Sequence, residues 1–103
     1  MTRTPIHPGL ILADELKELD ISARTLATSI DVPPNRLYQI IAGKRELTAD
    51  TALRLARYFG TSDEFWLNLQ RIYDLDLARQ KIGPDLKSIR PRSHAAVAPL
   101  NQR

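Results

Sequence analysis

Side chains able to read the bases of nucleic acids cluster at four positions: Asn35, Arg36, Tyr38 and Gln39. Amide and guanidinium groups hydrogen-bond the base edges that a DNA major groove exposes. A helix surface without a ligand usually mixes Glu with Lys, whereas no acid occurs here between Asp31 and Glu46. Taken singly, each residue also suits a solvated surface, and Tyr38 suits a half-buried ring at the edge of a core. Together the four residues predict a base-reading surface.

Groups able to hold phosphate flank this cluster. Lys44 and Arg45 follow it closely, and Ser22 and Arg24 stand at the start of the preceding helical pattern. Cationic side chains, hydroxyls and the free N–H groups at the start of a helix all bind phosphate oxygens. We therefore expect phosphate contacts from Ser22, Arg24, Lys44 and Arg45.

Two short helical patterns within residues 22–45 must position these side chains. Apolar residues recur at three- and four-residue spacing, as Leu26, Ala27 and Ile30 in the first pattern and as Leu37, Ile40 and Ile41 in the second. Ser22 is a suitable cap for the first helix, and Pro34 suits the first position of the second, which ends at Gly43. The small side chain of Ala27 permits a close crossing. This layout predicts a helix-turn-helix.

Two further amphipathic patterns predict helices on either side of this motif. Residues 8–19 carry an apolar stripe of Leu10, Ile11, Leu12, Leu16 and Leu19, and His7 is interpreted as the residue at the helix entry. Residues 49–58 follow a cap at Thr48 and end at Gly60, with Ala52, Leu55, Ala56 and Phe59 expected on the buried side. Arg54 and Arg57 face outward there. Phosphate contact, pairing with nearby acids and simple solvation all remain open for these two arginines.

A fifth, longer helix is predicted from Asp63 to about Ile82, because Thr61 and Glu64 match a capping box. One side, which we expect to pack on the other helices, carries Phe65, Trp66, Leu69, Ile72 and Tyr73. The opposite side, with nothing left in the chain to cover it, carries Leu67, Leu75, Ala78 and Ile82. An exposed apolar strip usually marks a partner site, and self-association is the favoured partner. A second protein, or a stripe that is only partly apolar, is the alternative.

Length and composition fit one small globular domain, with 103 residues of which 43% are hydrophobic and 26% charged, and the predicted helices make this domain all-α. There is no cysteine, and His7 and His94 are far apart, so we expect no metal site, no cofactor and no catalytic residues. No apolar run is long enough to span a membrane, which favours a cytoplasmic protein without a membrane partner. Residues 34–58 hold five cations against two acids, which favours an anionic ligand.

The chain is expected to divide into a domain at 1–82 and a flexible basic tail at 83–103. The tail contains Lys87, Arg90, Arg92 and Arg103 against the single acid Asp85, and it shows no helical periodicity. Contact with phosphates or with a partner, and no role at all, are both compatible with this composition.

The run LYQIIAGKRELTADTALRLARYFGTSDEFWLNLQRIYDL, together with the opening HPGLILADEL, resembles the HigA or VapI-like branch of the XRE helix-turn-helix family. The blocks GKR, TADTALRLARYFG and FWLNLQ are more specific than the helical periodicity, and the resemblance covers roughly residues 6–78. It implies a five-helix, lambda-repressor-like fold. It also implies an antitoxin that neutralises a HigB-like toxin, a RelE-like ribonuclease, and that represses its own operon as a homodimer on a palindromic operator.

Three residues depart from the family pattern. Ala23 replaces a common Gln that contacts phosphate, Asp31 stands where Gly is preferred in the turn, and Pro33 replaces a Ser or Thr cap. Asp tolerates left-handed backbone angles, so the turn can still form. A stand-alone transcriptional regulator without a toxin is the closest alternative function. A protein-only adaptor comes next and an enzyme last, since no paired carboxylates suggest a catalytic cleft.

Overall fold

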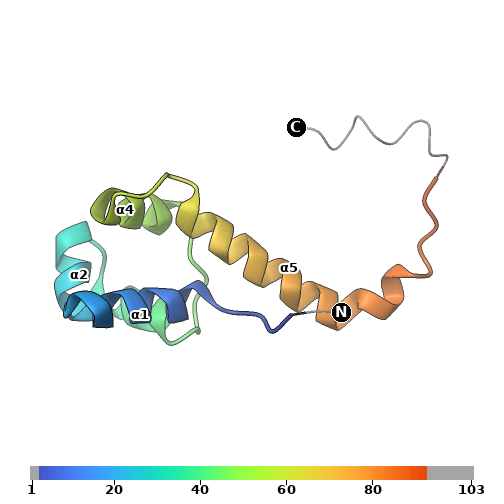
Figure 1. Cartoon of the computed structure of the whole chain (residues 1–103), viewed down its shortest axis with the longest axis horizontal. Helices are drawn as coiled ribbons and strands as arrows, with labels where there is room; N and C mark the ends of the chain where they lie inside the picture. The colour runs from blue at the N-terminus through green and yellow to red at the C-terminus, as the bar shows by residue number, and fades with distance from the viewer. Residues whose placement is uncertain (1–2, 93–103) are drawn as a thin grey trace.

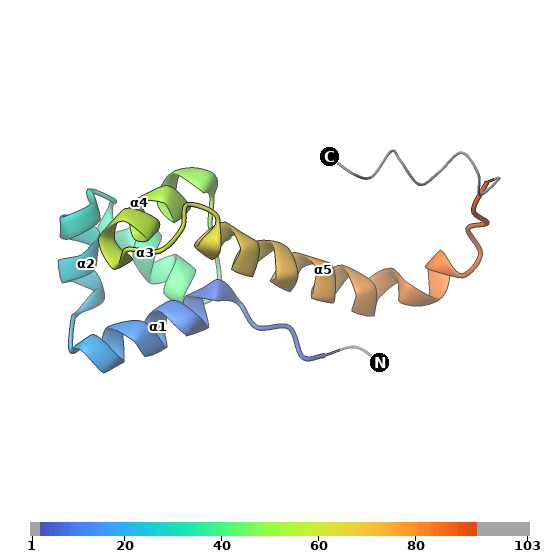
Figure 2. The ribbon, with the colours of Figure 1, turned by 45° about the horizontal axis from the view of Figure 1, so that its top comes forward.

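Five α-helices make up the computed structural model, which describes residues 3–92. In chain order they are α1 (Pro8–Leu19), α2 (Ala23–Ile30), α3 (Pro34–Ile41), α4 (Ala49–Phe59) and α5 (Phe65–Leu86). The first four helices gather into a bundle, and α5 leaves this bundle as a long arm (Figures 1 and 2). No strand occurs among the described residues. The all-α, five-helix fold predicted from the sequence is confirmed.

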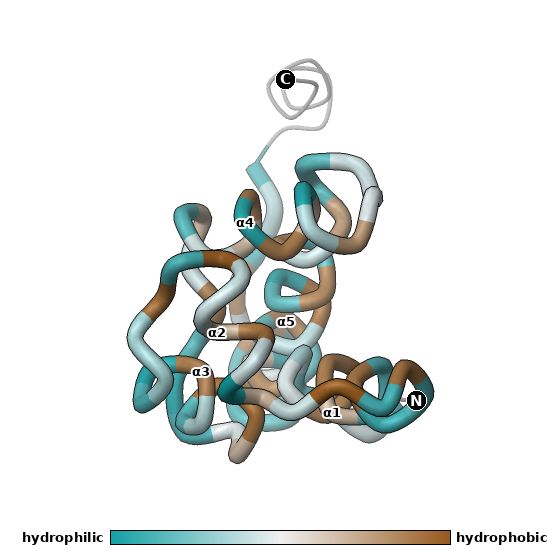
Figure 3. Tube along the Cα trace, turned by 90° about the vertical axis from the view of Figure 1, so that its left-hand side faces the viewer, coloured by the Kyte–Doolittle hydropathy of each residue, from teal (hydrophilic) through white to brown (hydrophobic). Residues whose placement is uncertain are grey.

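The core is formed by apolar side chains from α1 to α4 and the loop before α4, closed by Trp66 at the start of α5. Leu12, Leu26, Leu37, Ile40, Leu47 and Leu55 are its largest fully buried apolar side chains. Hydrophobic and hydrophilic stretches alternate along each helix, as the hydropathy of the trace shows (Figure 3). The stripe on α1 is narrower than predicted, because Leu10 and Leu19 are 58% and 48% exposed. Only the side of α1 that faces α3 and α5 is covered.

The start of α1 lies directly against the end of α3. A Cβ added at Gly9 would lie 1.9 Å from the carbonyl oxygen of Ile40, so no other residue fits there without moving a backbone. The side chain of His7 caps the helix, since its Nδ1 accepts a 2.9 Å hydrogen bond from the N–H of Gly9. The His7 ring also packs edge-on against Tyr73 of α5, with ring centroids 4.9 Å apart. The predicted helix-entry role of His7 is confirmed.

Two predicted side-chain caps are absent from the described helices. Thr48 precedes α4 in an extended conformation but forms no side-chain cap, and α4 ends at Phe59 instead of Tyr58. The capping box of Thr61 and Glu64 is also wrong. In a capping box the Thr61 hydroxyl would accept from the N–H of Glu64, and the Glu64 carboxylate would accept from the N–H of Thr61. Here the Thr61 hydroxyl donates to the carbonyl of Ser62, and the N–H of Thr61 donates to the carbonyl of Ala56 at 3.0 Å. No side-chain cap precedes α5, which begins later than predicted, at Phe65.

α5 also ends later than the sequence indicated, at Leu86, with Gly83 and Pro84 inside it. A proline inside a helix removes its own N–H donor and its ring crowds the carbonyl four residues earlier. This one lies in the last turn, where the following amides still find acceptors. The N–H groups of Lys87 and Ser88 bond to the carbonyls of Pro84 and Asp85 at 3.3 and 3.2 Å, which tightens and closes the helix. The remainder of the predicted tail, residues 93–103, lies outside the described residues.

We predict that Gly9→Ala lowers the free energy of unfolding by about 1 to 3 kcal/mol or more, because its methyl group would overlap backbone atoms of α3. Gly83→Ala is the matched control, since nothing outside its chain neighbours lies within 4 Å of an added Cβ. That variant should stay within about 1 kcal/mol of the wild type. Urea denaturation of both variants measures the difference. Equal stability of the two variants would contradict the close contact of α1 and α3.

Candidate nucleic-acid interface

α2 and α3 form the predicted helix-turn-helix. Ala27 is fully buried, as expected for a small residue where the two helices cross. The turn between them relies on Asp31, which adopts the left-handed conformation (φ 59°, ψ 52°). The N–H of Val32 then donates to the Ala27 carbonyl at 2.9 Å and closes the end of α2. Pro33 precedes α3 without a side-chain cap, as predicted.

One side of α3 is buried and the other faces solvent. Leu37 and Ile40 are the buried residues, and they fix the orientation of the helix on the core. The opposite side carries the four predicted base-reading residues, of which Asn35, Tyr38 and Gln39 are exposed and Arg36 is half-buried. The helix contains no acid. α3 therefore presents donors and amides to solvent, while the base-reading role of these residues stays a prediction.

The loop after α3 folds back onto the helix. The N–H groups of Gly43 and Lys44 donate to the carbonyls of Ile40 and Gln39 at 3.0 and 2.8 Å, and Gly43 has a positive φ of 75°. Arg45 then reaches the exposed face of α3, where its Nε donates to Oε1 of Gln39 at 2.9 Å. Lys44 and Arg45 are both exposed. The predicted phosphate-binding cations therefore lie next to the predicted base-reading face.

The other two predicted phosphate-binding residues lie at the start of α2, where both are exposed. The Ser22 hydroxyl accepts from the N–H of Thr25 at 3.0 Å and donates to the Thr25 hydroxyl at 2.9 Å. This confirms Ser22 as the helix cap. Because its hydroxyl is occupied by these two bonds, the first N–H groups of α2 and the side chain of Arg24 are the donors left for an anion.

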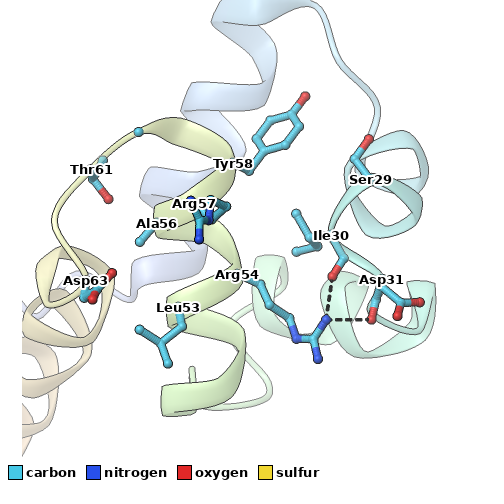
Figure 4. A pocket seen from close by; sticks show the side chains of 11 residues that line it. Ser29, Ile30, Asp31, Leu53, Arg54, Ala56, Arg57, Tyr58, Thr61 and Asp63 are labelled. Atoms are coloured by element: carbon cyan, nitrogen blue, oxygen red, sulfur yellow. Dashed lines mark hydrogen bonds between the residues drawn. The ribbon is translucent and has the colours of Figure 1, made fainter.

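Arg54 has a structural role. Figure 4 shows its guanidinium reaching the end of α2, where Nη1 donates to the carbonyls of Ile30 and Asp31 at 2.9 and 3.4 Å. Its Nε also pairs with Asp50 at 2.7 Å. A cation at this position satisfies free carbonyls and complements the helix dipole. The expected pairing of Arg54 with a nearby acid is therefore observed, and its contact with phosphate stays untested.

A buried glutamine that the sequence analysis missed anchors the exit loop to α5. Gln70 is 5% exposed, and its Oε1 accepts a 2.8 Å hydrogen bond from the N–H of Leu47. Its Nε2 donates to Asp74 at 2.9 Å. The loop that carries Lys44 and Arg45 is therefore fixed at its far end by a residue 23 positions away from Leu47.

A second missed contact ties the N-terminal segment to α5, along which this segment runs (Figure 1). Asp76 is 5% exposed and pairs with Arg3 at 2.8 Å and, more weakly, with Arg79 at 3.5 Å. A buried carboxylate requires such partners. The contact explains how α5 can hold a charged residue on its covered side.

The outer side of α5 is exposed as predicted. Leu67, Leu75, Ala78 and Ile82 all face solvent. The covered side is narrower than predicted, because Phe65 and Ile72 are also exposed while Trp66 is buried and Leu69 and Tyr73 are half-buried. The bundle covers only one edge of α5, since α1 and α4 are the helices that contact it most.

The sequence and the fold were compared with known proteins. Residues 12–66 match the family model described as helix-turn-helix. The chain is 51% identical to virulence-associated protein I of Dichelobacter nodosus over 73% of its own length and 70% of the relative's. It superposes on an addiction module antidote protein of the HigA family from Coxiella burnetii with a TM-score of 0.84 and 53% identity, covering 86% and 99% of the two chains.

A further solved structure is antitoxin HigA of Pseudomonas aeruginosa with the higBA promoter. It has a TM-score of 0.82 and 43% identity to this chain, and the match covers 87% of this chain and all of the other. The two structural likenesses therefore cover more of the chain than residues 12–66 alone. The chain belongs to the HigA-type branch of the XRE helix-turn-helix family.

As a HigA-type protein, the chain keeps the fold despite its departures from the family pattern. Asp31 adopts the left-handed angles for which glycine is usual, and α3 forms without a capping side chain before it. Within residues 3–92, no group of three or more His, Cys, Asp or Glu side chains is arranged to hold a metal, and no helix is long and apolar enough to cross a membrane.

We predict that Gln70→Ala destabilises this HigA-type fold by about 1 to 3 kcal/mol, because it leaves the amide of Leu47 buried without a partner. Gln80→Ala removes an exposed glutamine from the same helix and should cost less than about 0.5 kcal/mol. Thermal unfolding compares the two. If Gln80→Ala lowered the melting temperature as much as Gln70→Ala, Gln70 would not be an anchor.

Proposed function

We propose that this chain is the antitoxin of a HigBA-type toxin-antitoxin system and that it represses its own operon by binding operator DNA. The observation that carries the proposal is the acid-free, solvent-facing side of α3 in a fold of the HigA type. It is supported by the Pseudomonas aeruginosa relative, whose structure includes a promoter.

In the proposed complex α3 enters the major groove. Asn35 and Gln39 lie one helical turn apart on its exposed side, and side-chain amides suit the donor and acceptor of an adenine edge. Arg36 can bond guanine or a phosphate, and Tyr38 offers a ring and a hydroxyl. Lys44, Arg45, Arg24 and the start of α2 would hold the phosphate backbone.

We further propose that two copies of the chain associate through the outer side of α5. A groove between α4 and α5 is lined by apolar residues, which include Leu53, Leu67, Leu75 and Ala78, and by charged residues such as Glu64, Arg71 and Asp74. A homodimer would cover this groove and Ile82 beside it. Two α3 helices about 34 Å apart could then read the two halves of a palindromic operator.

The toxin partner rests on family membership. A HigB-like, RelE-like ribonuclease would be bound and neutralised by this chain, with the part of the α5 surface that a dimer leaves free as one candidate surface. A stand-alone XRE-type regulator is the second candidate function, because the same α3 face would serve it equally well.

For the DNA-binding proposal we predict different effects from two exposed residues. Gln39→Ala should reduce the free energy of binding to the cognate duplex by about 1 to 3 kcal/mol and relax discrimination at one base pair. Lys44→Ala should weaken binding to all duplexes alike. It should also lower the slope of log K against log salt concentration by about one, since it releases one phosphate contact. Fluorescence anisotropy at several salt concentrations measures both. Equal losses on cognate and random DNA for both variants would remove the proposed division of roles.

For the dimer we predict that Leu75→Glu shifts the protein toward monomers, because it places a charge in the proposed apolar interface. Leu19→Glu changes an equally exposed leucine at the end of α1 and should leave the mass unchanged. Sedimentation equilibrium gives the mass of each. A monomeric wild type, or a dimer that survives Leu75→Glu, would rule out this interface.

For the toxin we predict that a tagged form of this chain co-purifies with the product of the adjacent reading frame. Expression of that neighbour alone should stop growth, and co-expression of this chain should restore it. The control is co-expression of an unrelated helix-turn-helix protein. If the neighbour is harmless and does not bind, the stand-alone regulator becomes the better reading.

A further inference from the structure

The hydrogen bond between Arg45 and Gln39 determines which atoms Gln39 offers to its surroundings. A guanidinium group has only donors, so its partner in the amide must be the oxygen. The 2.9 Å bond from Nε of Arg45 therefore places Oε1 of Gln39 toward the exit loop. The amide NH₂ lies on the other side of the group, and it forms no hydrogen bond within residues 3–92.

The backbone on both sides of Arg45 is fixed by hydrogen bonds. The loop that carries it is bonded to α3 through the N–H of Lys44 and to α5 through the N–H of Leu47, each at 2.8 Å. Arg45 stands between these two fixed points. Its terminal nitrogens have no hydrogen-bond partner within the described residues, so they remain available as donors.

We infer that Arg45 is a positioning residue for base recognition, which fixes Gln39 so that the pair offers donors to the major groove and selects guanine over adenine. The inference rests on the proposed DNA-binding function. Guanine presents two neighbouring acceptors, N7 and O6, whereas adenine presents one acceptor and one donor. An adenine amino group would compete with Arg45 for the amide oxygen of Gln39. A glutamine with a free amide would favour adenine instead.

The probe for this inference is a set of duplexes selected by the wild-type protein from a random-sequence library. The position that Gln39 reads is the one at which Gln39→Ala loses discrimination. Duplexes with each of the four base pairs at that position are then titrated with wild type, Arg45→Ala, Arg45→Lys, Lys44→Ala and the double variant Arg45→Ala/Gln39→Ala.

We expect the wild type to prefer guanine at that position and Arg45→Ala to reduce this preference by about tenfold. Arg45→Lys retains the charge, so it should keep the affinity for the three duplexes without guanine at that position while losing much of the preference for guanine, since a lysine cannot fix the plane of the amide. In the Gln39→Ala background Arg45→Ala should change the preference no further. Lys44→Ala removes a neighbouring charge and should leave the preference unchanged.

A chemical substitution in the DNA adds an independent test. Replacing the guanine by 7-deazaguanine removes the N7 acceptor and should weaken the wild type, with a much smaller effect on Gln39→Ala. Residues 39 and 45 are exposed, so unchanged melting temperatures should accompany these effects.

The inference is overturned if Arg45→Ala weakens all four duplexes equally and adds to Gln39→Ala, which would make Arg45 a phosphate contact only. A wild-type preference for adenine would overturn it as well. If the wild type bound selected and scrambled duplexes alike, the proposed function would fail, and this inference with it.

Discussion

The approach of α1 to α3 at Gly9 is the constraint on which the rest of the structure depends. With the Ile40 carbonyl only 1.9 Å from where a Cβ would lie, the two helices touch through their backbones. The small, fully buried Ala27 lets α2 pack on α3 from another direction. Because α1 and α2 are the helices that pack on α3, the remaining side of α3 is left to solvent, and that side carries its polar residues.

α5 adds a second level of organisation through polar contacts. Gln70 fixes the loop between α3 and α4, and Asp76 fixes the segment before α1. One helix therefore holds two separate parts of the chain in place. The apolar outer side of the same helix is where we place the partner. The same helix, α5, carries the proposed interface and holds the loop with Lys44 and Arg45. Leu47 and Gln70 line the same groove as Leu67 and Leu75.

Much of this architecture follows from local sequence. Ser22, Pro34 and Gly60 mark helix ends by their own chemistry, and the apolar spacing in α2 and α3 locates the buried side of each. The predictions from sequence are wrong where contacts between distant parts of the chain determine the local structure. The Thr61 and Glu64 pattern fails because the N–H of Thr61 is bonded to the carbonyl of Ala56 at the end of α4, and Leu10 is exposed because none of the described helices packs beside it. The roles of Gln70 and Asp76 depend on partners 23 and 73 positions away, which periodicity alone does not reveal.

The most direct test of the account is an NMR titration of ¹⁵N-labelled protein with a palindromic duplex chosen by the protein itself. We expect saturation at two chains per duplex, with the largest shifts at the exposed residues of α3, the loop at 43–46 and the first amides of α2. Amides on the buried side of α3 and in α4 should shift much less. Saturation at one chain per duplex, or shifts concentrated away from α3, would contradict the claim that a pair of α3 helices reads the DNA.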